Sequence, residues 1–213
     1  MNRTDKKTGF VFKCRNTSGR KGVAAVEFAL SLSLWMILLL GIFDGSYYLL
    51  VNEKVDRIAY TVSDIVTQYD ATPSHEKLSD IMMAAGQLMQ PMSFNPSTLG
   101  TPDGEGDYPE ATGYIIVTSV YQDPTQGPIV KWQYTYPPAG NGVSTPTSSV
   151  GNSAEGSLAT LPNGLTLNSK DNVIVTEVFY TFSPLFLDQF VSKVIRRETV
   201  FKPRLGGLIV PPA

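Results

Sequence analysis

The sequence has little of several residue types that catalytic and metal-binding proteins use. Among its 213 residues there is one cysteine, Cys14, and one histidine, His75. The sequence therefore offers no intrachain disulfide and no second His or Cys for a zinc site. A Ser-His-Asp triad would have to use His75, and there is no Gly-x-Ser-x-Gly elbow or phosphate-binding glycine loop. These absences argue against an enzyme, and they indicate no catalytic residue, cofactor or metal.

Charge is also scarce, and it is unevenly placed. Charged side chains make up 17% of the chain, below the roughly 25% that is usual in soluble domains. Residues 1–22 carry seven basic side chains and one acidic one, whereas the rest of the chain carries 10 basic and 18 acidic ones. This distribution does not indicate a nucleic-acid-binding protein. No small-molecule substrate is expected either. A basic block in front of an apolar run is instead the pattern that orients a membrane helix.

The apolar run covers residues 23–43, and Glu27 is its single charged residue. A helix of that length extends about 31 Å, which matches a hydrocarbon core of about 30 Å. We expect a transmembrane helix over 23–44, residues 1–22 in the cytoplasm, and the remainder outside.

Three interpretations of this helix remain open: a cleaved secretory signal, a plain signal anchor, and a prepilin-type signal that is cut in front of the apolar run. The length of the run and the bulky residues that follow it disfavour a secretory signal.

Glu27 bears on the choice between the last two interpretations. A carboxylate inside an apolar helix costs about 2–3 kcal/mol on insertion scales, unless it snorkels from near the helix end. A cut after Gly22 would make Val23 the first residue and Glu27 the fifth, an arrangement that is similar to type IV prepilins. There the new α-amino group and the glutamate form complementary charges between subunits, and each stabilises the charged form of the other. Glycine also suits a peptidase site at the membrane face, because it has no Cβ.

The residues around this position resemble a known family. Residues 20–30, Arg-Lys-Gly-Val-Ala-Ala-Val-Glu-Phe-Ala-Leu, resemble the opening of TadE/TadG-like pseudopilins of the tight-adherence (Flp) pilus system. Residues 41–45, Gly-Ile-Phe-Asp-Gly, resemble the segment that closes the family's membrane helix. Residues 178–185 and 201–204 resemble its C-terminal strand, turn and Arg-Pro-Arg-like ending, although Lys202 replaces the first arginine.

The resemblance implies a minor pseudopilin that is needed for pilus assembly, adhesion or secretion. It implies a single-pass protein of the bacterial inner membrane, with a periplasmic C-terminal domain, associated with the pilus. Gly22 and Val23 would flank the cut made by a prepilin peptidase. Glu27 and Phe28 would dock other pilin or pseudopilin subunits and the pilus assembly platform. The alternative is an uncleaved, signal-anchored envelope protein whose outer domain binds a ligand or partner.

Apolar spacings of three and four from Val51 to Tyr69 predict that the helix extends over 45–70. We interpret this stripe as packing on the domain's own sheet; a seam between subunits is the alternative. A second helix is expected after Thr72, the predicted N-cap, with Pro73 in its first position. Its apolar face comprises Leu78, Ile81, Met82, Ala85, Leu88, Met89 and Met92.

The rest of the chain reads as strands and loops. Strands are predicted over 114–121, 129–136, 173–182 and 194–201. In the second strand, Val130, Trp132, Tyr134 and Tyr136 are expected to share one face. Composition predicts a solvated loop over 97–110, a long exposed loop over 137–165 and a short helix over 184–191. Two helices before a mainly antiparallel sheet predict a pilin-like α+β domain over 71–213.

Overall fold

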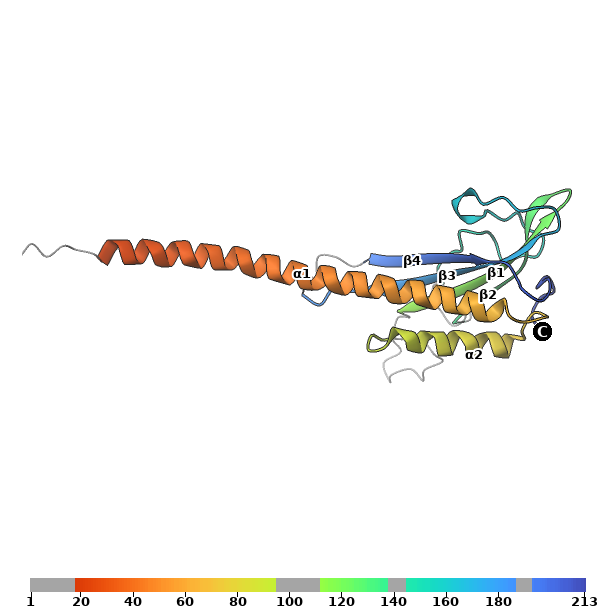
Figure 1. Cartoon of the computed structure of the whole chain (residues 1–213), viewed down its shortest axis with the longest axis horizontal. Helices are drawn as coiled ribbons and strands as arrows, with labels where there is room; N and C mark the ends of the chain where they lie inside the picture. The colour runs from red at the N-terminus through yellow and green to blue at the C-terminus, as the bar shows by residue number, and fades with distance from the viewer. Residues whose placement is uncertain (1–17, 95–111, 138–144, 187–192) are drawn as a thin grey trace, which may run out of the picture. The chain divides into compact units, whose positions relative to one another are not determined.

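The structure is a computed structural model that describes residues 18–94, 112–137, 145–186 and 193–213 (Figure 1). The chain divides into two compact units, Met1–Phe43 and Asp44–Ala213. The helices are α1 (Ser18–Val66) and α2 (His75–Gly86), with short 3₁₀ turns η1 (Gln87–Met89) and η2 (Pro162–Gly164). The strands are β1 (Gly113–Asp123), β2 (Gly127–Tyr136), β3 (Asn172–Phe182) and β4 (Lys193–Phe201). Residues 1–17 of the basic head, and the loop predicted over 97–110, lie outside the described residues.

The four strands form one antiparallel sheet in the order β2-β1-β3-β4. Two helices followed by this sheet confirm the predicted α+β class. Helix α1 continues beyond the apolar run as expected, and it ends at Val66, short of the predicted residue 70.

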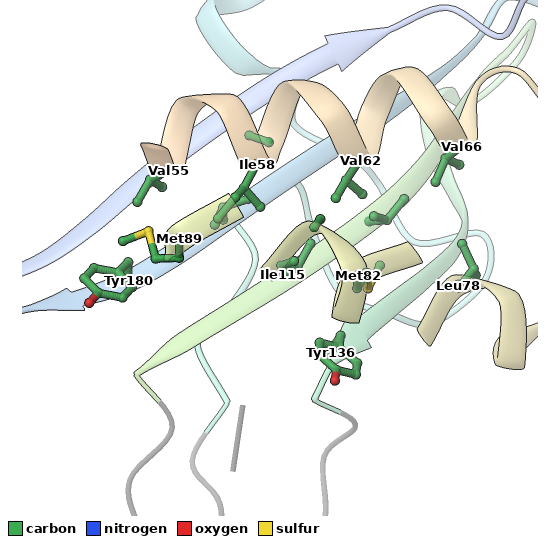
Figure 2. Close-up of a cluster of buried hydrophobic side chains, with 14 of the residues drawn as sticks. Val55, Ile58, Val62, Val66, Leu78, Met82, Met89, Ile115, Tyr136 and Tyr180 are labelled. Carbon is green, nitrogen blue, oxygen red and sulfur yellow. The ribbon is translucent and has the colours of Figure 1, made fainter. Parts of the chain in front are cut away.

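The main core lies between the helices and one face of the sheet. From α1 it takes Val51, Val55, Ile58, Val62 and Val66, none of which is exposed. Figure 2 shows the last four of these on the side of α1 that faces the labelled side chains of α2, η1 and the sheet. Most of the apolar stripe of α1 thus packs on the chain's own domain, as we interpreted it. Each fully buried aliphatic side chain of this kind contributes about 1.5–3 kcal/mol through burial.

Helix α2 begins later than predicted. Its N-cap is Ser74, whose hydroxyl accepts a hydrogen bond from the backbone N–H of Lys77 at 3.4 Å, so the prediction of Thr72 is wrong. Ser is as good an N-cap as Thr, and either hydroxyl can accept from a first-turn N–H. The predicted apolar face is otherwise correct, with Leu78, Met82, Ala85, Met89 and Met92 buried. Leu88, however, is 36% exposed.

The second face of the sheet is covered as well. A smaller core joins Val120, Val130, Val173 and Val175 of the sheet to residues of the segment 145–167. From that segment come Val150, Ala159 and Leu161, all buried. The prediction of a long exposed loop over 137–165 is therefore wrong for these residues. Apart from η2 and an isolated bridge between Leu158 and Ile129, the described part of that range contains no helix or strand.

A β-bulge corrects the predicted face of β2. Trp132 lies opposite Ser119, but the next pair is Val130 with Val120, so Lys131 is the extra residue. A bulge of this kind shifts the alternation of side chains by one position. Trp132, Tyr134 and Tyr136 therefore face the helices, whereas Val130 packs in the second core. The expectation that all four share one face is wrong for Val130.

The turn after β3 and the C-terminal tail complete the domain. Residues 184–186 form no helix, and the rest of the helix predicted over 184–191 lies outside the described residues. In the tail, Leu208 is fully buried, and its carbonyl accepts hydrogen bonds from Ser119 Oγ at 2.6 Å and Trp132 Nε1 at 2.7 Å. The Ala213 carbonyl accepts from the His75 backbone N–H at 3.1 Å. The C-terminus is thus part of the folded domain.

Candidate functional site

The residues predicted from the sequence lie together in the first turns of α1. Gly22, Val23, Glu27 and Phe28 are all helical and exposed. Val23 and Glu27 are four residues apart, so they share one face of the helix, one turn apart. Ser31 Oγ donates to the Glu27 backbone carbonyl at 2.8 Å, which satisfies the hydroxyl within its own helix.

Gly22 has no packing reason within the described chain. A Cβ added there would have nothing within 4 Å. A glycine inside a helix costs about 0.5–1 kcal/mol relative to alanine, because its backbone loses more freedom. The fold of this chain does not require glycine at position 22, and alanine would stabilise the helix.

The helix around Glu27 exposes a continuous apolar surface. Apart from Leu40, the large apolar residues from Val23 to Phe43 are about half or more exposed, among them Phe28 at 68% and Trp35 at 70%. Among the described residues, the stretch from Gly22 to Val66 is the one helix long and apolar enough to cross a membrane. Length, composition and exposure together indicate a membrane anchor.

Asp44, at the first position after the apolar run, was not identified as a site residue from the sequence. Its side chain is buried, and its Oδ1 accepts hydrogen bonds from the backbone N–H groups of Leu185 at 3.0 Å and Phe186 at 3.3 Å. Asp44 and Leu185 belong to 41–45 and 178–185, two of the stretches that carry the family resemblance. An acidic residue directly after an apolar run, and a turn of two apolar residues after a strand, were the available signals.

Two basic residues of the third stretch bind carboxylates. Lys202 Nζ lies 2.7 Å from Asp171 Oδ1, and this hydrogen bond lowers the pKa of Asp171 below its usual range. The Arg204 guanidinium lies 2.5 Å from Asp64 Oδ1 on α1. Lys202 therefore forms an ion pair, although the family-like ending would have arginine at this position.

The most buried charge of the described chain is Glu177, in the middle of β3. Its carboxylate has no exposure, and one oxygen accepts from Arg196 Nε at 3.1 Å and Nη2 at 2.7 Å. The same oxygen accepts from Ser149 N at 3.1 Å and Oγ at 3.0 Å, and Ser148 Oγ donates to the other oxygen. Glu198 lies opposite Glu177 in the sheet, and Arg196 bridges the two carboxylates. Burial of the charge is tolerated because its hydrogen-bond capacity is filled.

This cluster fixes the cover of the second sheet face rather than forming an open site. Ser148 and Ser149 belong to the segment 145–167, so Glu177 links that segment to the sheet. Sequence reasoning missed the cluster, although Glu177 is the one charged residue of a mostly apolar strand and was a usable signal.

The other residues considered for catalysis or metal binding form no site among the described residues. His75 is exposed, and its ring centroid lies 5.2 Å from that of Tyr134. Within the described ranges, no three or more His, Cys, Asp and Glu side chains are grouped in a way that could hold a metal. Burial raises the pKa of Tyr134, Tyr136 and Tyr180 above the usual value of tyrosine.

Comparison with known proteins bears on the N-terminal site. No curated protein and no solved structure is detectably similar to the chain. Residues 22–64, about a fifth of the chain, match the family model described as TadE-like protein. The match begins at Gly22 and includes both the apolar run and the part of α1 that packs on the sheet. It confirms the family resemblance: the chain carries a TadE-like segment, and that family is a structural, pilus-associated one of the cell envelope.

Proposed function

We propose that the chain is a minor pseudopilin of a Tad/Flp-type pilus, cut by a prepilin peptidase between Gly22 and Val23. The observation that carries this proposal is the start of the TadE-like match at Gly22, at the border between the basic head and the exposed apolar helix. The protein would sit in the bacterial inner membrane with its basic head in the cytoplasm and the α+β domain in the periplasm. There it would serve pilus assembly, and through it adhesion or secretion.

Cleavage by a peptidase would explain why position 22 is glycine, which the fold itself does not require. Position 22 is helical and open, and a Cβ would fit there without a clash. A requirement from outside the chain therefore accounts best for glycine there. A peptidase whose active site closes on the backbone at the membrane face is such a requirement, because a side chain at the cut would obstruct it.

Docking between subunits would explain why the charged Glu27 stands in an apolar helix, where the membrane disfavours it. Glu27 is the single charged residue of the apolar run, and in lipid it costs about 2–3 kcal/mol. Cleavage would create an α-amino group on Val23. In an assembly, the amino group of one subunit can neutralise Glu27 of its neighbour, and low polarity strengthens that attraction. The exposed ring of Phe28 would then pack against the same neighbour.

The periplasmic part of α1 offers a second contact surface. Its sheet side is buried, whereas Leu49 and Tyr60 on other sides are 68% and 57% exposed. Tyr60 is held in place by an edge-on contact with Phe201, with ring centroids 5.0 Å apart. Exposed apolar residues on a rigid helix favour packing against other pilin or pseudopilin subunits, or against the assembly platform.

The docking role is tested with Glu27→Gln, and the matched control is Ser31→Ala, one helical turn further along. Both substitutions leave Gly22 and Val23 unchanged, and glutamine is close in size to glutamate. We expect Glu27→Gln to abolish co-purification with pilus components and pilus formation, and Ser31→Ala to leave both intact. Normal assembly by the Glu27→Gln chain would overturn the docking role. A chain that is never cut would favour the uncleaved envelope anchor instead.

A further inference from the structure

We propose that the turn after β3 inserts Leu185 and Phe186 into the surface of the bilayer that α1 crosses, as a second, shallow lipid contact of the periplasmic domain. This inference rests on the membrane insertion in the proposed function. It adds a lipid-binding surface that lies far along the chain from the anchor helix itself.

The turn is tied to the residue at which the apolar run ends. Asp44 Oδ1 accepts the backbone N–H groups of Leu185 at 3.0 Å and Phe186 at 3.3 Å, and Asp44 is only 7% exposed. These hydrogen bonds hold the backbone of the turn. The side chains of Leu185 and Phe186 are 64% and 55% exposed. Two adjacent exposed apolar side chains on a fixed backbone form a small, ordered apolar surface.

Chain connectivity places this surface at the membrane boundary. Asp44 follows Phe43, the last residue of the apolar run, and consecutive Cα atoms are about 3.8 Å apart. Groups bonded to the Asp44 carboxylate therefore lie within about 10 Å of the end of the run, however the domain is oriented. The headgroup layer on each side of a bilayer is roughly 5–8 Å thick. With Phe43 at the hydrocarbon boundary, as the proposed function has it, the backbone of the turn lies in the headgroup layer or a few ångströms from it.

The neighbouring side chains are those that membrane interfaces favour. The rings of Tyr47 and Tyr48 pack on Phe182, with centroid distances of 5.5 and 5.2 Å. Lys193 Nζ lies 5.9 Å from the centroid of Tyr48. Tyrosine is enriched at headgroup depth, and lysine can extend its ammonium toward lipid phosphates. Apolar tips beside tyrosines and a lysine therefore fit a lipid surface better than a purely apolar protein partner.

The test uses the full-length chain with Cys14→Ser, so that one new cysteine carries a polarity-sensitive fluorophore. Leucine is replaced by cysteine at position 185, at position 34 in the middle of the apolar run, or at position 205. Leu205 is as exposed as Leu185, at 69%, but its neighbour Arg204 binds Asp64, about 30 Å along α1 from Asp44. Each chain is placed in nanodiscs that contain lipids with a spin-label quencher either near the headgroup or deep in the acyl chain.

We expect the probe at 185 to lose emission with the shallow quencher, the probe at 34 with the deep quencher, and the probe at 205 with neither. If 34 is quenched but 185 behaves like 205, the lipid contact is refuted while membrane insertion stands. If 34 is not quenched by either lipid, insertion itself fails, and the proposed function with it. Emission from 185 that shifts to the blue only when a second protein copy enters the disc would assign the surface to a protein partner and overturn the proposal.

Discussion

The ion pair between Glu177 and Arg196 gives the strongest stability prediction, because its two partners are unequally exposed. Glu177 has no exposure, whereas the Arg196 side chain is 36% exposed and also reaches Glu198. Substituting Arg196 by methionine leaves a charge in the core with only the donors of Ser148 and Ser149. Loss of one partner from a buried pair costs about 3–5 kcal/mol. Arg196→Met should therefore lower the free energy of unfolding by that amount.

The opposite substitution should cost less. Glu177→Gln leaves Arg196 partly hydrated and still paired with Glu198, so only hydrogen bonds to a charged group are lost, worth about 1.5–3 kcal/mol. Glu198→Gln is the matched control, since its carboxylate is partly exposed and such pairs contribute about 0–1 kcal/mol. The double variant Glu177→Leu with Arg196→Met removes both charges, so it should be more stable than Arg196→Met alone.

The assay is urea unfolding of the full chain in a mild detergent. Fluorescence of the buried Trp132 reports the unfolding once Trp35 is replaced by phenylalanine. Arg196→Met within 0.5 kcal/mol of the parent, on the order of the error in such comparisons, would refute the reasoning. So would a double variant that is less stable than Arg196→Met, because the cost would then not arise from a stranded charge.

Two further predictions concern the C-terminal tail. The pKa of Asp171 is lower in the folded chain than the roughly 3.9 of an unfolded one, so its contribution to stability is present above that pH and is lost as the pH falls through the folded value. Lys202→Met should raise the pKa of Asp171 in a carboxyl ¹³C NMR titration, and an unchanged titration would contradict the ion pair. A Cβ at Gly206 would lie 2.7 Å from the Asp70 carbonyl oxygen, whereas one at Gly207 meets nothing closer than 3.8 Å. Gly206→Ala should therefore destabilise the domain by about 1–3 kcal/mol in the same urea assay and Gly207→Ala should not; equal effects would show that the tail is not held at Asp70.

Local periodicity was enough to predict most of the fold. The four predicted strands each agree with the structure within two residues at either end, because β-branched and aromatic runs were bounded by Gly, Pro and Asp. The burial of the apolar stripe from Val51 to Val62 could be predicted because its spacing matches one helix face. Element type therefore followed from short-range pattern, and the order of the elements predicted the α+β class.

What could not be predicted depends on contacts distant in sequence. The alternation of side chains between the two faces of β2 shifts by one position at Lys131. A bulge of this kind has no signature in a regular run of residues. The prediction of an exposed loop over the second sheet face rested on its Gly, Ser, Thr and Pro content. Such a composition indicates an irregular conformation, but it does not indicate whether the loop is buried. A better signal lay in β3, where Val173, Val175 and Phe179 alternate with Ile174 and Val178, so both faces are apolar. A strand that is apolar on both faces indicates a cover on each side.

The candidate site was predicted unevenly for the same reason. Gly22 and Glu27 carry their signal in local spacing, and the TadE-like match covers that region. Asp44 and Glu177 acquire their roles from partners about 140 and 20–30 residues away. No single-sequence pattern specifies such pairs, although an isolated acid in an apolar context marks each position.

The most direct test of the account is the mature N-terminus of the full-length protein, purified from the membranes of cells that contain the pilus system. N-terminal sequencing and intact mass should both give a chain that begins at Val23, and a Gly22→Phe variant should retain the basic head. A mature protein that begins at Met1 or Asn2 would contradict the central claim, because no new amino group would then exist to meet Glu27.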